Sequence, residues 1–257
     1  MWKRIFIVVF IGLGFSFMGG ELEEKFYKAI RGTYEVDQFK LEEIEAAITP
    51  KTKVIFCETV SNPLLEIANL PELAKLAKKH NLQLVVDNTF SPLSITPKEL
   101  GANITIHSLT KFINGSSDTV GGVICGSLEF INQLRNVNDG ACMLLGATMD
   151  SFRSASILKN LRTLHIRMHK HSENAMFLAE KFQELGLKTV YPGLENHPGH
   201  ETFKQMMNDE YGFGGMLTID VGSLEKANTL MELMQEKNLG YLAVSLGFYK
   251  TLFSAPG

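Results

Sequence analysis

A lysine and an aspartate stand at the ends of apolar segments, where their side chains could do chemistry. Lys111 follows two hydroxyl residues, Ser108 and Thr110, and Asp87 ends the apolar run Leu82–Val86. A lysine just past a buried strand is partly desolvated, which favours the neutral amine that forms Schiff bases. The two hydroxyls could hold a phosphate. A buried carboxylate needs a cationic partner, and a cofactor pyridinium would be a suitable one.

Each of these residues also has an ordinary structural interpretation. Taken alone, Asp87 is typical of a helix cap or a turn, and Lys111 is typical of a solvated surface lysine. The combination of carboxylate, hydroxyls and lysine at neighbouring strand ends is what favours a functional site.

The elements that must position these side chains alternate between strand and helix. Pro71 opens a helix that ends at Asn81, with apolar residues at helical spacing between them. Four short apolar runs, typical of strands buried on both faces, lie at 54–57, 82–86, 104–106 and 120–125. This alternation predicts an α/β fold with a mostly parallel sheet flanked by helices, in which ligands bind beyond the carboxyl ends of the strands.

The sequence pattern changes after Ser151. A long helical pattern covers 157–185, and a helix is expected at 224–237. Strand-like segments, separated by loops, lie at 188–191, 216–221 and 241–244. This part predicts a smaller second α/β unit.

Composition excludes several classes of protein. Hydrophobic residues make up 45% and charged residues 21%, which is typical of globular chains. The net charge of −3 gives no basic excess to neutralise phosphates, so nucleic-acid binding is not expected. The three cysteines form no C-x-x-C pair, and no metal-ligand spacing is present, so neither a disulfide scaffold nor a metal site is predicted.

The first twenty residues allow three interpretations. Lys3 and Arg4 precede an uncharged stretch, Ile5–Met18, which resembles a signal peptide or a short anchor. Gly12 and Gly14 hint at a nucleotide-binding loop, but Phe17 stands where the third glycine of that motif belongs. The third interpretation is a core strand or a hydrophobic leader.

Several motifs in order resemble the Cys/Met-metabolism family of pyridoxal-phosphate (PLP) enzymes, of fold type I. The resemblance runs from about Val36 to Gly257 and includes LVVDNTFSP, HSLTKFINGSSDTVGG, YPGLENHPGHE and YGFGGMLTIDV. It implies PLP as cofactor, an amino-acid substrate and γ-elimination or γ-replacement on methionine, cystathionine or activated homoserine. It also implies a homo-oligomer (dimer or tetramer) in the cytoplasm, away from the membrane unless the N-terminal segment is an anchor.

The resemblance assigns roles to individual residues. Lys111 resembles the Schiff-base lysine that also shuttles protons, and Asp87 resembles the aspartate that keeps the pyridine nitrogen protonated. Ser108 and Thr110 resemble the hydroxyls that bind the cofactor phosphate. Two further residues complete the expected site: Asn62 resembles the asparagine at the ring hydroxyl, and Ser245 resembles a residue near the substrate carboxylate.

The chain also departs from the family pattern. The upstream glycine-rich phosphate loop, the Tyr-Arg pair and the ring-stacking tyrosine are not found, nor is the downstream arginine that binds the substrate carboxylate. We therefore expect a chain truncated at both ends, with a divergent segment 1–35, a large PLP-binding domain 36–155 and an incomplete C-terminal domain 156–257. A catalytically impaired fragment or a degenerate homologue without turnover is the alternative function. The remaining arginines, among them Arg167, are expected on helices away from the strand ends.

Overall fold

The computed structural model describes residues 41–255, and contacts divide these residues into two units. The smaller unit holds 41–52 and 126–148, and the larger unit holds 53–125 and 149–255. The predicted segment 1–35 and the interpretations of residues 1–20 lie outside the described residues. The expected division at residues 35 and 155 stays a prediction.

The smaller unit contains short helices. They are α3 (Leu41–Ala47), α5 (Leu128–Leu134) and α6 (Ala141–Leu145). The hydroxyl of Ser127 caps α5 by accepting the backbone N–H of Phe130 at 3.1 Å. Gly146 ends α6 in the left-handed conformation, which glycine adopts without steric cost.

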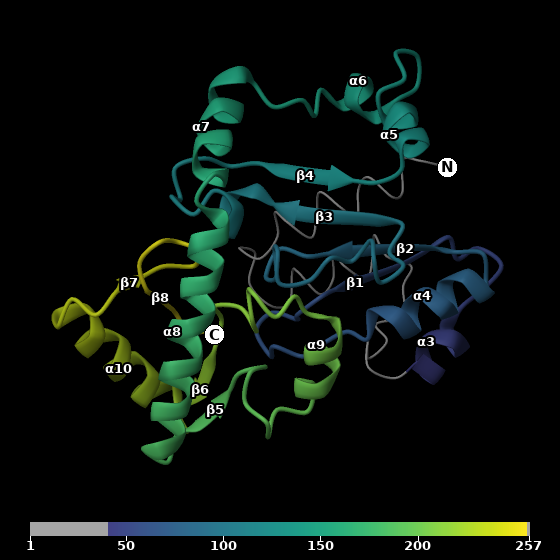
Figure 1. Ribbon diagram of the computed structural model, residues 1–257. Coiled ribbons are helices and arrows are strands. Elements are labelled where there is room, and N and C mark those ends of the chain that lie inside the picture. Colours follow the sequence, from purple (N-terminus) through teal and green to yellow (C-terminus); the bar gives the residue numbers. More distant parts are fainter. Residues whose placement is uncertain (1–40, 256–257) are drawn as a thin grey trace. The chain divides into compact units, whose positions relative to one another are not determined.

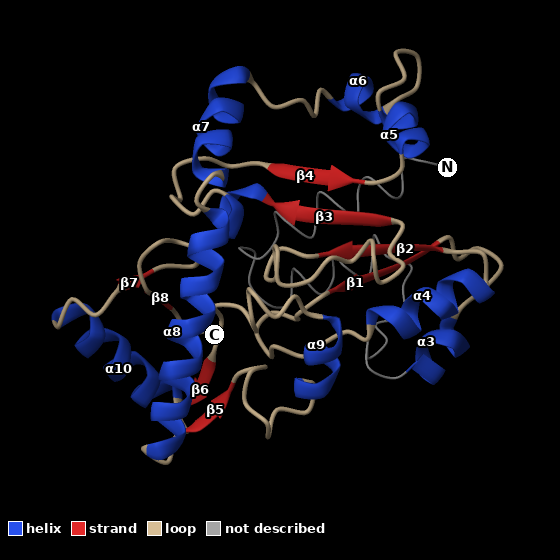
Figure 2. Cartoon of the chain, viewed as in Figure 1, coloured by secondary structure: helices blue, strands red, loops and turns tan. Residues whose placement is uncertain are grey.

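The larger unit is built on a four-stranded sheet in the order β1-β2-β3-β4 (Figures 1 and 2). The strands are β1 (Val54–Glu58), β2 (Gln83–Asp87), β3 (Ile104–Ser108) and β4 (Gly122–Cys125). The first three are parallel, and β4 is antiparallel to β3. The predicted mostly parallel sheet is therefore confirmed, with one antiparallel edge strand.

The strand register places the expected site residues at one edge of the sheet. Glu58 pairs with Asp87, and Asp87 pairs with Ile106, two residues before Ser108. The carboxyl ends of β1, β2 and β3 thus meet at the same edge, as parallel pairing requires.

Helix α4 (Leu70–Lys79) packs against β1 and β2 through its apolar side. It begins as the sequence predicts, because Asn69 caps it by accepting the N–H of Glu72 and Pro71 occupies the first turn. Its inward residues Leu70 and Leu73 are almost fully buried, and each such leucine contributes roughly 1.5–3 kcal/mol of transfer free energy. The helix thus packs on the two strands whose carboxyl ends carry Glu58 and Asp87.

Two helices follow where one long helix was expected. Helix α7 spans Ser151–Leu161, and α8 spans Leu164–Glu184. The prediction of one helix over 157–185 is wrong at Arg162 and Thr163, where the Thr163 hydroxyl bonds the carbonyl of Asn160 at 3.0 Å. Threonine competes in this way for backbone groups, which the apolar periodicity does not reveal.

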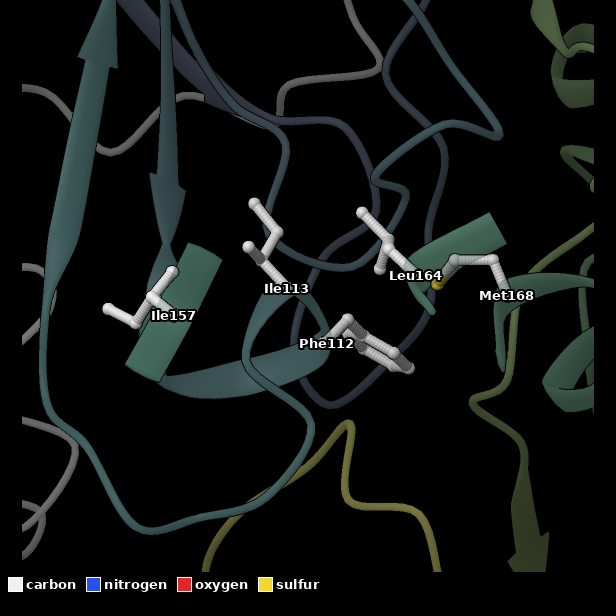
Figure 3. Packing of buried hydrophobic residues seen from close by; sticks show 5 residues of the cluster. All are labelled: Phe112, Ile113, Ile157, Leu164 and Met168. Carbon is white, nitrogen blue, oxygen red and sulfur yellow. The ribbon is translucent and has the colours of Figure 1, made fainter. Parts of the chain in front are cut away.

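A π-helical turn, η1 (Leu109–Ile113), follows β3 and packs against both of these helices. Figure 3 shows Phe112 and Ile113 of this turn between Ile157 of α7 and the pair Leu164 and Met168 of α8. All five side chains are buried, so an apolar cluster fixes one side of the turn that carries Lys111.

Most of the remaining elements of the larger unit lie in the expected segments, whereas the helix over 200–206 and the strand over 252–253 were not predicted. Strands β5 (Lys188–Val190) and β6 (Thr218–Asp220) pair antiparallel, and β7 (Tyr241–Leu242) and β8 (Leu252–Phe253) pair parallel. The helices are α9 (His200–Met206) and α10 (Leu224–Glu236). Among residues 41–255, no helix combines the length and apolar character that crossing a membrane requires.

Candidate active site

Asp87 ends β2 with a carboxylate that has few partners. The backbone N–H of Thr89 donates to Oδ1 of Asp87 at 2.9 Å, and the Thr89 hydroxyl donates to the same carboxylate. Burial raises the pKa of Asp87, and the hydrogen bonds from Thr89 oppose that shift. Within the described part of the chain, no basic side chain forms an ion pair with Asp87. The site therefore offers a negative charge that a cationic ring could neutralise.

Thr89 also joins the ends of two strands. Its hydroxyl accepts the backbone N–H of Ser108, the last residue of β3, at 2.8 Å. The backbone of Thr59, just past β1, donates to the carbonyl of Asp87 at 2.9 Å. Thr89 belongs to the polar residues that follow β2 in the sequence, but no role was assigned to it; the signal was Asp87, since an aspartate often accepts the backbone N–H two residues on.

Ser108 lies at this edge with a hydroxyl that is still available. The residue is 7% exposed, and its Oγ has no hydrogen-bond partner among residues 41–255. A hydroxyl of this kind can bind a ligand oxygen.

Thr110 is differently placed from Ser108. Its hydroxyl accepts the N–H of Gly121 at 3.0 Å and contacts the carbonyl of the same residue at 3.3 Å. These contacts attach the turn η1 to the segment before β4. A ligand oxygen at Thr110 would have to replace the longer contact.

Lys111 lies half-buried in the middle of η1. Its backbone leaves the helical region at φ −88° and ψ −125°, so the turn is interrupted at this residue. Nζ of Lys111 donates to Oγ of Ser245 at 3.3 Å. Burial lowers the pKa of Lys111, which increases the fraction of neutral, nucleophilic amine near neutral pH.

The segment around Ser245 packs directly on η1, the turn that carries Lys111 and is called the lysine turn below. Gly247 adopts a φ of +76°, and a Cβ at this position would lie 2.3 Å from the backbone nitrogen of Phe112. Glycine is therefore required for two reasons: the backbone has a positive φ, and there is no room for a Cβ beside Phe112. Gly247 was not predicted from the sequence, although it follows the expected site residue Ser245 by only two positions.

Asn62 is the expected site residue that the structure leaves apart from the others. It is exposed, it follows β1 by four residues, and its backbone N–H donates to Oε2 of Glu58 at 3.2 Å. Within the described residues it makes no hydrogen bond to any of the other five candidates. It does lie at the same sheet edge, beyond the carboxyl end of β1.

Arg167 corrects one expectation. It lies on α8 as expected, but it is not remote from the strand ends, because its guanidinium donates to the carbonyls of Phe112 and Ile113, directly after Lys111. The guanidinium also donates to the carbonyl of Asn160 at 3.2 Å. Most of its donors therefore bond to the protein itself.

The arrangement combines a lysine able to attack a carbonyl carbon, an aspartate without a basic partner among the described residues and, at the end of β3, the hydroxyl of Ser108. Among residues 41–255, no three His, Cys, Asp or Glu side chains gather in a way that could hold a metal ion. The chemistry that these residues support is thus covalent binding of an aldehyde or ketone that also carries a cationic and an anionic group.

Comparison with known proteins gives concordant matches. The family model described as "Cys/Met metabolism PLP-dependent enzyme" matches residues 22–257. Methionine gamma-lyase of Arabidopsis thaliana is 42% identical over 213 residues, covering 82% of this chain and 48% of the relative. Cystathionine gamma-lyase of Bacillus subtilis (strain 168) is 40% identical over 225 residues, covering 86% of this chain and 57% of the relative.

Solved structures agree with the sequence matches. The crystal structure of metB from Corynebacterium glutamicum superposes with a TM-score of 0.74 at 36% identity, over 83% of this chain and 54% of that one. This similarity confirms the predicted fold, a mostly parallel sheet flanked by helices. The chain spans about half the length of the curated relatives it matches.

Proposed function

Because this chain belongs to the Cys/Met metabolism family of PLP-dependent enzymes, we propose that it carries the cofactor-binding core of an enzyme of sulfur amino-acid metabolism. The proposed reaction is elimination or replacement of the γ-substituent of methionine, cystathionine or an activated homoserine. Relatives named as methionine gamma-lyase, cystathionine gamma-lyase and cystathionine gamma-synthase support this choice of substrates.

The residues of the site fit pyridoxal phosphate in their chemistry. The Asp87 carboxylate suits a protonated ring nitrogen, the half-buried Lys111 amine suits an aldehyde, and the Ser108 hydroxyl suits a phosphate oxygen. When bound, PLP supplies an electron sink that stabilises negative charge at the substrate's α-carbon. We propose Thr110 as a second phosphate ligand and Asn62 as a ligand on the ring hydroxyl side.

Each proposed step is carried out by a side chain of this protein. The negative charge of Asp87 keeps a proton on the ring nitrogen that faces it, because a buried carboxylate strongly favours a cationic neighbour. The neutral amine of Lys111 would first hold the cofactor. Once released by the incoming substrate, it would accept a proton from the α-carbon, give that proton up again, and as a neutral amine accept a second proton from the β-carbon. The electron pair left at the β-carbon would form a double bond to the γ-carbon, and the γ-substituent would leave with the electrons of its bond.

Ser245 acts on the lysine amine. Its Oγ lies 3.3 Å from Nζ of Lys111 and limits the directions in which that amine can point. A substrate whose α-carbon lies within reach of Nζ would also lie near this hydroxyl, which supports the proposal that Ser245 lies near the substrate carboxylate.

One observation carries the proposal: Asp87, without a basic partner in the described part of the chain, ends the strand next to the one that leads into Lys111. The test is a product assay with purified protein, PLP and, separately, methionine, cystathionine or O-acetylhomoserine. We expect 2-oxobutanoate and ammonia, or a replacement product when a thiol or cysteine is added, above the level given by Lys111→Ala.

The assay also separates the two candidate outcomes. PLP bound through Lys111 without any product would contradict the proposed activity and support the homologue without turnover. Equal PLP binding by wild type and Lys111→Ala would contradict the proposed site itself.

We also propose that the protein is a cytoplasmic homo-oligomer, on the family resemblance and on the cytosolic occurrence of the cofactor. Sedimentation of the purified protein as a dimer or tetramer, together with recovery from the cytosolic fraction of cells, would support this proposal. A monomer, or recovery with membranes, would contradict the corresponding half of it.

A further inference from the structure

Arg167 makes an unusual set of contacts with the turn that carries Lys111. Its guanidinium donates to the carbonyls of Phe112 and Ile113, the two residues directly after the lysine, and to the carbonyl of Asn160 at the end of α7. Its Nε donates to the hydroxyl of Thr163 at 3.1 Å. One side chain of α8 thereby bonds to the lysine turn, to α7 and to the connection between α7 and α8.

The turn makes room for this guanidinium. Gly115 has a φ of +70°, and a Cβ there would lie 2.3 Å from Nη1 of Arg167. Any larger residue at position 115 would displace the guanidinium. The fit of an arginine against a glycine is specific, because the fork of donors reaches several carbonyls that a lysine amine could not reach together.

A second polar connection lies beside the first. The side-chain amide of Asn160 donates to Oδ1 of Asn114 at 2.8 Å, and Asn114 donates to the carboxylate of Asp118 at 2.8 Å. The backbone N–H groups of Asn114 and Gly115 bond back to the carbonyls of Leu109 and Lys111. The end of η1 is thus tied to α7 through side chains and closed on itself through its backbone.

The lysine turn is held on its other sides as well. Phe112 and Ile113 pack into the apolar cluster with α7 and α8 (Figure 3). Gly247 lies against the backbone of Phe112, and the Ser245 hydroxyl meets the lysine amine. Arg167 supplies the charged donors that bind the turn's outward carbonyls, and nothing else on α8 does so among the described residues.

We propose that Arg167 is a positioning residue for Lys111: by binding the carbonyls of Phe112 and Ile113 it fixes the turn so that the lysine amine stays half-buried beside Ser245. The proposal rests on the proposed function in assigning Lys111 as the reactive lysine. It explains why an arginine whose guanidinium bonds to carbonyls of the protein itself lies beside the reactive turn.

The test measures the reactivity of Lys111 in protein without added cofactor. Lysines are labelled competitively with acetic anhydride across a pH series, and the label on each lysine is quantified by peptide mass spectrometry. The variants are Arg167→Met, which removes the donors, and Arg167→Lys, which keeps the charge. Arg162→Met is the matched control, because Arg162 is an exposed arginine at the start of the same connection.

In wild type we expect Lys111 to titrate below the other lysines, because it is half-buried. In Arg167→Met the turn loosens and water reaches the amine, so its neutral fraction at pH 8 should fall by about threefold or more, which corresponds to half a pKa unit. Arg167→Lys should give an intermediate value, and Arg162→Met should match wild type.

Hydrogen exchange distinguishes positioning from general loss of stability. The amides of Asn114 and Gly115 should exchange faster in Arg167→Met, while the amides of β1 and β2 keep their wild-type protection. A folded Arg167→Met with unchanged Lys111 labelling and unchanged exchange at these two amides would overturn the proposal. If Arg167→Met does not fold, the same comparison is made with Arg167→Lys, for which an unchanged profile would have the same meaning.

These outcomes are independent of cofactor binding. If wild type fails to bind PLP while Arg167→Met still changes Lys111 labelling, the proposed function fails and the positioning role stands. If PLP binds through Lys111 equally well in wild type and Arg167→Met, with equal labelling, the positioning role fails and the proposed function stands.

Discussion

Nζ of Lys111 donates to Oγ of Ser245 at 3.3 Å, although 134 residues separate them in the chain. Lys111 lies in the turn after β3, whereas Ser245 lies in the loop between β7 and β8. The contact brings the expected reactive amine and the expected substrate-side residue together. It also means that the turn η1 and the loop between β7 and β8 must both be folded for the Lys111 amine to keep its orientation.

Ser245→Ala should allow the Lys111 amine to point in more directions, because the hydroxyl that accepts its hydrogen bond is lost. The lost hydrogen bond is worth about 0.5–1.5 kcal/mol or less at this length, so urea unfolding should show only a small loss of stability. Attachment of PLP to Lys111 should nevertheless slow, and Ser245→Thr should restore it because the hydroxyl is kept. The kinetics of PLP attachment, followed by visible absorbance, check this. Equal rates in wild type and Ser245→Ala would show that the contact does not direct the amine.

Thr89→Val should destabilise the protein through the ends of β2 and β3. The methyl group replaces the hydroxyl that accepts the Ser108 N–H and donates to Asp87, so a backbone donor loses its partner. A donor left in this way costs about 1–3 kcal/mol. Urea unfolding should show a loss in this range, and Thr89→Ser, which keeps the hydroxyl, should lose clearly less. Identical stabilities for Thr89→Val and Thr89→Ser would show that the Thr89 hydroxyl does not stabilise the ends of β2 and β3.

The sequence predicts the sheet edge well, because the apolar runs that form β1, β2 and β3 end at polar residues. Asp87 and Ser108 could therefore be placed together by the rule for parallel strands alone. Contacts between distant segments could not be predicted in this way: nothing local links Lys111 to Ser245, or Arg167 to Phe112. The break between α7 and α8 was also hidden, because the apolar spacing continues across Thr163 while its hydroxyl bonds the preceding turn.

Asp87→Asn should stabilise the protein without cofactor at neutral pH. Burial raises the folded-state pKa of Asp87 above its ordinary value of 3.8, so the folded state binds this proton more tightly than the unfolded chain. The destabilisation caused by ionised, buried Asp87 is therefore absent below pH 3.8. It develops as the pH rises through the raised pKa and is complete above that pKa. Asparagine has no such charge and can still accept the Thr89 N–H.

The check is urea unfolding of wild type and Asp87→Asn between pH 3 and 8. The variant should gain stability relative to wild type as pH rises, while its affinity for PLP falls sharply. A stability difference that does not change with pH would show that the Asp87 carboxylate is not in an unfavourable environment.

Gly247→Ala should destabilise the fold by more than its backbone conformation explains. A Cβ at Gly247 meets the backbone of Phe112, whereas a Cβ at Gly186, which has the same φ of +76°, meets nothing within 4 Å. Gly186→Ala thus measures only the loss of stability that a Cβ causes on a left-handed backbone, about 1–2 kcal/mol. The difference between the two variants in urea unfolding measures the close packing on the lysine turn. Equal losses would show that the loop carrying Ser245 does not press on that turn.

The central claim is that Lys111 is the residue that holds PLP. The direct measurement is reduction of the PLP-treated protein with borohydride, proteolysis, and mass-spectrometric assignment of the phosphopyridoxyl group among all lysines. We expect the group on Lys111, at one equivalent or less. It should be lost in Lys111→Ala, whereas replacement of the exposed Lys75 in Lys75→Ala should leave it in place. A label spread over surface lysines, or an equal label in Lys111→Ala, would contradict the claim.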